Sequence, residues 1–105
     1  MNKELLDKLQ EKYPKIFVAG CPSICGDGWY EIIDSLCGII QNRCNFYNNV
    51  VNESKYSIGH RLHMQTECTN IKYKEDSMRF YYTDGDSFID GAIQMAEEIS
   101  SRVKQ

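Results

Sequence analysis

Three basic residues and a tyrosine stand close together in the second half of the chain, and their side chains suit one kind of chemistry. They are Lys72, Lys74, Arg79 and Tyr81. A guanidinium offers a planar fork of donors to a phosphate, and an ammonium offers a compact positive charge. An aromatic ring offers a flat surface on which a base stacks. This set of residue types indicates a site for a small anionic, nucleotide-like ligand.

The four residues share a face only if the chain around them forms a hairpin. Segments 66–74 and 78–83 are rich in aromatic and β-preferring residues, and they predict two antiparallel strands. A two-residue turn at 75–76 then sets Lys72 directly opposite Arg79, on the face that also holds the other two residues. The opposite face is apolar and suits packing on helices. It holds Ile71, Tyr73, Met78 and Phe80.

Lys72 and Arg79 repel one another in this register, because like charges directly opposite on a hairpin are destabilising. Three arrangements offset the repulsion. The side chains splay into solvent, they pair with acidic side chains such as Glu53 or Glu67, or an anionic ligand binds between them. The first two are the commoner fate of exposed charges. The third is the functional hypothesis. If the basic residues pair with carboxylates of the same chain, this hypothesis loses its support.

Trp29 is a second aromatic candidate for the site. A lone tryptophan at the first turn of a helix is more typical of a core anchor than of a ligand platform. Both roles stay open at this point. We expect the three basic residues to contact the ligand while Tyr81 or Trp29 stacks on it.

Helices are predicted on both sides of the hairpin. Apolar spacing predicts a short helix over 3–13 and a central helix from 29 to about 45. Asp86 is the expected N-cap of a last helix, which runs to about Val103. Residues 47–65 are polar and predict a long loop. The expected fold class is α+β, with two N-terminal helices, a central antiparallel β-hairpin and a C-terminal helix packed on one face of the sheet.

The composition predicts a single domain over residues 1–105. Hydrophobic residues make up 42% and charged residues 26%, which excludes a disordered chain. The net charge of −3 argues against binding to duplex nucleic acid, because that affinity needs a field of Lys and Arg. The sequence has neither a membrane-spanning apolar run nor a signal-peptide pattern. Five cysteines, an odd number with no export signal, indicate a reducing cytoplasmic compartment.

Metal and catalytic sites have weaker support. Cys21 and Cys25, together with His60 and His63, match a tetrahedral zinc site loosely, and ordinary loop thiols and surface imidazoles are the alternative. No local pattern links a Cys or Ser to a His and an orienting acid, as nucleophilic catalysis requires. We therefore expect a protein that is not an enzyme, with no cofactor and no metal.

Two strings of the sequence are similar to a family of small uncharacterised proteins encoded by bacteriophages and prophages. They are GDGWYEIIDSLC at 26–37, and IKYK followed by MRFYY within 71–82. In that family a GDGW start of a helix is followed by a KxKFGxLRFY-like hairpin and a closing helix, and the resemblance covers residues 13–100. The chain departs from the pattern where Glu75-Asp76 replaces Phe-Gly at the turn. It also stops at Gln105, where many members continue into a cysteine pair, so the resemblance implies no metal role.

The resemblance implies a phage-type protein that counters bacterial defence. Some such proteins sequester nucleotide immune signals, and others cap a defence protein. The basic and aromatic hairpin face favours the first role, a sponge for a nucleotide-like signal in the host cytoplasm. The alternative is a protein–protein inhibitor that presents its acidic surface and residues 47–65 to a defence effector. A homo-oligomer, most simply a symmetric dimer, is also expected, because pairing deepens the pocket that a small chain can build.

Overall fold

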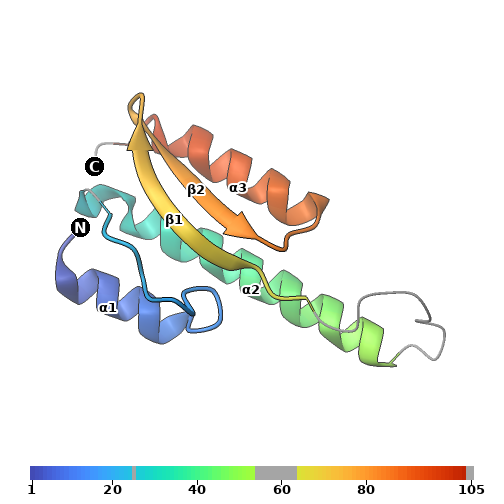
Figure 1. Cartoon of the computed structure of the whole chain (residues 1–105). Coiled ribbons are helices and arrows are strands. Elements are labelled where there is room, and N and C mark those ends of the chain that lie inside the picture. Colours follow the sequence, from blue (N-terminus) through green and yellow to red (C-terminus); the bar gives the residue numbers. More distant parts are fainter. Residues whose placement is uncertain (25, 54–63, 104–105) are drawn as a thin grey trace.

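Three α-helices and a two-stranded antiparallel sheet make up the described part of the chain, which is α+β. The computed structural model describes residues 1–24, 26–53 and 64–103. In chain order the elements are α1 (Lys3–Lys12), the 3-10 turn η1 (Asp27–Trp29), α2 (Tyr30–Glu53), β1 (Glu67–Lys74), β2 (Ser77–Thr83) and α3 (Ser87–Ser100). In Figure 1, α2 runs along the middle of the molecule, with α1 on one side and α3 on the other.

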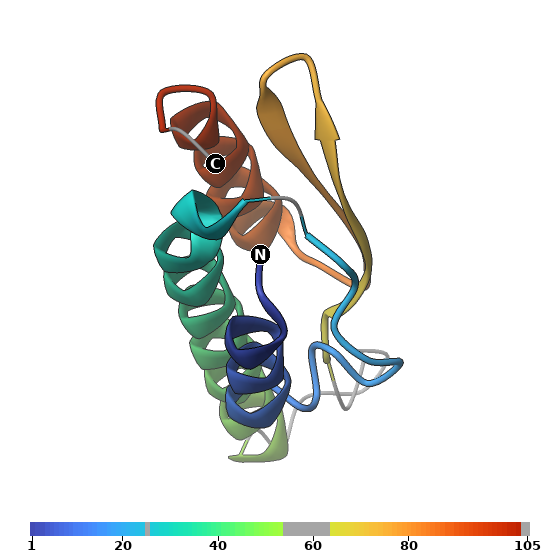
Figure 2. The ribbon, with the colours of Figure 1, turned by 90° about the vertical axis from the view of Figure 1, so that its left-hand side faces the viewer.

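The hairpin covers one side of the pair formed by α2 and α3. Figure 2 shows β1 and β2 on that side, and no described element on the opposite side of the pair. The segment that follows α1 runs beside β1, where the carbonyl of Ile16 accepts a hydrogen bond of 2.8 Å from the Cys68 N–H. Two surfaces therefore face solvent: the outer side of the hairpin and the outer side of α2 and α3.

The hairpin has the register that the sequence predicts. Lys72 lies opposite Arg79, and Ile71 lies opposite Phe80. The turn residues 75 and 76 both have positive φ, 52° and 62°, as in the two-residue turns whose twist matches that of a hairpin. Ile71 and Phe80 are each 3% exposed. The predicted apolar inner face is confirmed for Ile71, Met78 and Phe80, whereas Tyr73, which the sequence also places there, is 46% exposed.

Helix α2 is longer than predicted, and the beginning of the expected 47–65 loop is helical. The helix continues to Glu53, although asparagines like those near its end favour other conformations. Asn48 explains part of the difference, because its side chain binds both backbone groups of Met64. The Met64 N–H donates to Oδ1 at 2.7 Å, and Nδ2 donates to the Met64 carbonyl at 3.0 Å. Residues 54–63, the rest of the expected loop, lie outside the described residues.

Helix α3 begins at the N-cap that the sequence predicts. The carboxylate of Asp86 accepts a hydrogen bond of 2.9 Å from the Ile89 N–H and one of 2.8 Å from Nε of Arg43. Partial burial acts to raise the pKa of Asp86, but these two bonds lower it more, and the net pKa lies below the ordinary 3.8. The charged form of Asp86 therefore fixes the start of α3 and joins it to α2.

Acid should weaken the contacts of the Asp86 carboxylate with Arg43 and with the start of α3. The Asp86→Asn variant should show how much the charge contributes to the free energy of unfolding. A carboxyl whose pKa is lower in the folded state stabilises the fold above its unfolded pKa, and that contribution disappears as the pH falls through the folded value. Asparagine keeps the cap but not the charge. We expect Asp86→Asn to lower the free energy of unfolding by about 0.5–1 kcal/mol at neutral pH. The difference from the parent should shrink as the pH falls below about 4. Urea unfolding at several pH values checks this, and a difference independent of pH would contradict it.

Candidate functional site

The predicted site residues of the hairpin lie together on its outer face. Lys72 and Arg79 face each other across the two strands, and Nζ of Lys72 lies 5.7 Å from the centre of the Tyr81 ring. Nη1 of Arg79 donates to Oγ of Ser77 at 2.7 Å. The side chain of Tyr81 is 44% exposed. The face is thus a small solvent-facing patch in which cationic groups border an open aromatic ring.

No acidic side chain of the described part neutralises this patch. The ion pairs among the described residues leave out Lys72, Lys74 and Arg79. Glu67, one of the two acids expected to pair with them, lies at the far end of β1 opposite Thr83. The side chain of Glu53, the other, lies outside the described residues. No described carboxylate therefore offsets the repulsion between Lys72 and Arg79. Their contacts instead lead to different partners, that of Lys72 to the Tyr81 ring and that of Arg79 to Ser77.

Trp29 does not lie on the outer face of the hairpin with the other candidate residues. The residue is 1% exposed, and its Nε1 donates to the carbonyl of Ser100 at 3.2 Å. Its ring lies 5.8 Å from that of Tyr73, on the inner side of the hairpin. The other reading of Trp29, a core anchor, describes what the structure shows.

A pocket of about 440 Å³ lies along the edge of β1. It brings Lys72 and Trp29 to one cavity, with Lys72 on the strand and Trp29 at the start of the central helical segment. Its lining residues are Ser23, Ile24, Trp29, Asn70, Ile71, Lys72 and Tyr73. The basic patch thus continues from the outer face of the hairpin to a hollow beside it, which gives a ligand at Lys72 a concave surface to enter.

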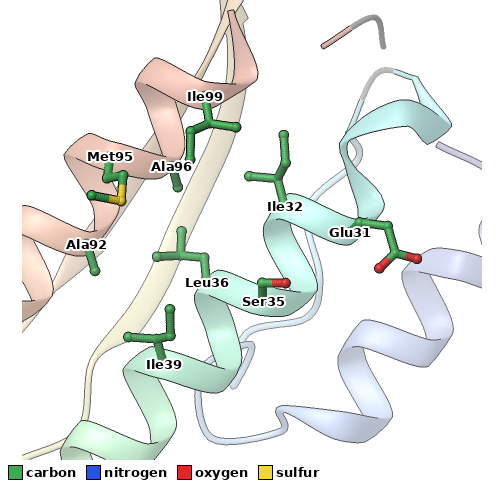
Figure 3. Close-up of a pocket in the computed structure, with 9 residues that line it drawn as sticks. All are labelled: Glu31, Ile32, Ser35, Leu36, Ile39, Ala92, Met95, Ala96 and Ile99. Atoms are coloured by element: carbon green, nitrogen blue, oxygen red, sulfur yellow. The ribbon is translucent and has the colours of Figure 1, made fainter. Parts of the chain in front are cut away.

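A second surface, which the sequence did not predict, lies on the outer side of α2 and α3. A groove of about 310 Å³ runs between the two helices and has mostly apolar side chains along it. In Figure 3, Leu36 and Ile39 of α2 and Ala92, Met95 and Ile99 of α3 point toward the space between the helices, whereas Glu31 points away from it. The groove carries no paired charges or nucleophile that would indicate catalysis, and its chemistry is that of an apolar contact surface.

We call this surface the α2/α3 face. It consists of Ile32, Ile39 and Phe46 on α2 and of Phe88, Ala92, Met95 and Ile99 on α3. Met95 is 66% exposed, Phe46 60% and Phe88 54%, which is unusual for large apolar side chains gathered on one side of a molecule. The signal in the sequence was an excess of apolar residues at seven-residue spacing, beyond those that one buried stripe needs.

Of the four residues that match a zinc site loosely, the structure describes Cys21 alone. Burial raises the pKa of Cys21 to about 11, and burial also raises the pKa of Cys68, a thiol outside that set, to about 12. Both shifts lower the thiolate fraction, and the thiolate is the nucleophilic form. Cys25, His60 and His63 lie outside the described residues, so the structure does not test the zinc match.

Two further observations bear on the class of protein. Among the described residues, α2 is the longest helix, and neither it nor any other is apolar enough over sufficient length to cross a membrane. A scan of protein-family models and searches among curated proteins and solved structures find no match for this chain.

Proposed function

We propose that the protein is a non-enzymatic binding protein that takes up a small anionic, nucleotide-like ligand on the basic outer face of its hairpin. The observation that carries the proposal is the cross-strand pair Lys72 and Arg79, with Lys74 beside it and no described carboxylate to neutralise the three charges. A like-charged pair directly opposite on a hairpin weakens it. A bound phosphate removes that repulsion, so ligand binding and hairpin stability support each other.

The arrangement of the patch suits a ligand that combines phosphate and a ring. Arg79 is held by Ser77, which restricts its guanidinium before any ligand arrives and lowers the entropy lost on binding. Lys72 already lies over the Tyr81 ring, so a phosphate drawn to Lys72 brings an attached base within reach of that ring. Stacking on an aromatic side chain contributes about 1–3 kcal/mol per base. The hollow at the β1 edge offers further contact area.

The proposed biological role extends this chemistry. With the resemblance to phage-encoded proteins, we propose that the ligand is a nucleotide signal of bacterial defence and that the protein sequesters it in the host cytoplasm. Sequestration needs tight binding and no turnover. The proposed work of the basic patch is therefore binding alone.

Native purification followed by mass spectrometry tests the proposal. The protein is expressed in bacteria, purified under native conditions, denatured and filtered, and the filtrate is searched for released nucleotides. We expect a stoichiometric nucleotide, or a rise in melting temperature with a member of a panel of cyclic and ADP-ribose-derived nucleotides. The double variant Lys72→Ala/Arg79→Ala should fold and lose both signals.

Two results would contradict the proposal. One is an empty protein whose melting temperature no nucleotide of the panel changes. The other is a nucleotide that the double variant retains with unchanged stoichiometry, because binding would then take place away from the basic patch. Circular dichroism of the double variant confirms that any loss of ligand is not a loss of fold.

A further inference from the structure

The apolar side chains of the α2/α3 face are spaced so that the face can match its own copy, which a twofold interface requires. Ile32, Ile39 and Phe46 follow one another at seven-residue spacing along α2, so they lie nearly in line on one side of the helix. We propose that this face binds a second copy of the chain, with the two copies related by a twofold axis that passes near Ile39. Helix α2 then packs antiparallel on its own copy, with Ile39 against Ile39 and Ile32 against Phe46.

Helix α3 has the same centre of symmetry. Phe88 and Met95 are also seven residues apart, and an antiparallel pairing about residues 91–92 sets Phe88 of one copy against Met95 of the other. The two residues nearest that centre are small. A Cβ added to Gly91 would meet no atom within 4 Å, and Ala92 carries only a methyl group. Small residues at the axis let two α3 helices approach closely.

The two centres lie at the same level of the molecule, which a single twofold axis requires. Trp29 reaches the carbonyl of Ser100, and Arg43 reaches Asp86. Trp29 and Arg43 are fourteen residues apart, and so are Asp86 and Ser100, so the two segments run antiparallel in step. Ile39, four residues before Arg43, therefore lies level with about residue 90, within two residues of the α3 centre at 91–92. One axis near these positions can serve both helices.

Charge does not oppose this self-association. At a twofold axis each residue faces the same residue of the other copy, so a charged residue there would meet a like charge and be repelled. The residues at the proposed axis are uncharged. Arg43, the charged side chain that crosses the face between Phe46 and Phe88 at 5.9 and 5.1 Å, is already neutralised by Asp86 at 2.8 Å. Glu31 also lines the groove, but its side chain points away from the space between the helices (Figure 3).

The proposed dimer goes beyond the ligand proposal and is independent of it. The hairpin lies on the opposite side of α2 and α3 from the α2/α3 face (Figure 2), so pairing through that face leaves both basic patches open to solvent. The dimer forms or fails to form whatever the patches bind.

Sedimentation velocity of the full chain tests the dimer. We expect the parent to sediment with twice the mass of one chain, and the variants Ile39→Glu and Met95→Glu to sediment as monomers with unchanged circular dichroism. The matched control is Val18→Glu, which places the same charge at another exposed apolar residue, 63% exposed and away from the face. That variant should stay dimeric. A monomeric parent would overturn the proposal and leave the face to a different protein.

Disulfide cross-linking tests the register. The variant Ile39→Cys should cross-link to its own copy under mild oxidation, because the axis brings the two positions together. Ile32→Cys and Phe46→Cys should cross-link efficiently only when the two variants are mixed. The parent chain, which keeps its own cysteines, gives the background. Cross-linking of Ile39→Cys no higher than that background would overturn the proposed register, and nucleotide binding by the same samples reports separately on the hairpin.

Discussion

Replacement of Trp29 by alanine is expected to lower the free energy of unfolding by about 3–5 kcal/mol. The residue is the largest of the fully buried side chains, and its indole N–H binds the carbonyls of Ser100 and Val103 at 3.2 and 3.3 Å. Truncation therefore opens a large cavity and leaves the end of α3 without a donor. Chemical denaturation followed by circular dichroism measures the loss, since the variant has no tryptophan fluorescence.

Tyr81→Ala is the matched aromatic truncation at an exposed site. Because Tyr81 is 44% exposed and lies on the outer face, its removal should lower the free energy of unfolding by less than about 1 kcal/mol. It should weaken nucleotide binding instead. Trp29→Phe should fall between the two in stability, which keeps the comparison measurable if the alanine variant unfolds. Equal stability losses for Trp29→Ala and Tyr81→Ala would contradict the core role of Trp29.

Charge reversal at Lys72 is expected to reduce nucleotide affinity by at least about tenfold while leaving the fold nearly as stable as before. Lys72→Glu changes the local charge by two units within contact range of a bound phosphate. It also turns the repulsion with Arg79 into an attraction, a gain of about 0.2–1 kcal/mol. It removes the contact with the Tyr81 ring, a loss of about 0.5–1 kcal/mol. These two effects nearly cancel, so the free energy of unfolding should change by less than about 0.5 kcal/mol.

The matched control is Lys8→Glu on the exposed surface of α1, which makes the same change in net charge away from the hairpin. Calorimetric titration of a nucleotide that binds the parent compares the two variants, and denaturation compares their stabilities. Lys8→Glu should bind as the parent does. If both variants lost the same affinity, the attraction would come from the net charge of the molecule and not from the basic patch.

The hairpin shows how much of this fold a sequence can predict. Alternating apolar residues in strands 67–74 and 77–83 leave one register in which Ile71 and Phe80 share a buried face, because a slip of one residue would turn them to solvent. The pairing of Lys72 with Arg79 follows from that register. The charges of the candidate site were therefore predictable because the packing of their neighbours determined where they point.

The end of α2 shows where local signals fail. Asparagines lower helix propensity through local hydrogen bonds, and no property of the sequence near Asn48 reveals that Met64 supplies two better partners. The role of Trp29 was open for a similar reason. A tryptophan can serve as a core anchor or as a stacking surface for a ligand. Which role it has depends on how α3 and the hairpin pack around it, and the sequence near Trp29 does not show that.

The α2/α3 face could not be predicted because periodicity locates an apolar stripe but not what covers it. Helix α2 has apolar residues over a wide arc, and Leu36 at 1% exposed and Ile39 at 45% exposed belong to the same pattern. Which of them is buried depends on how α3 and the hairpin pack, and those contacts join residues far apart in the chain. Seven-residue spacing inside a wider stripe is the feature by which similar faces can be sought.

The central claim is that an anionic nucleotide binds the basic outer face of the hairpin, and an NMR titration of amide chemical shifts tests it most directly. Backbone amide signals of the labelled full-length protein are followed while nucleotides of the panel are added. The account predicts saturable shifts concentrated at Lys72, Lys74, Arg79 and Tyr81 and absent from Lys72→Ala/Arg79→Ala. Saturable shifts confined to other parts of the chain, or no shifts with any nucleotide at millimolar concentration, would contradict it.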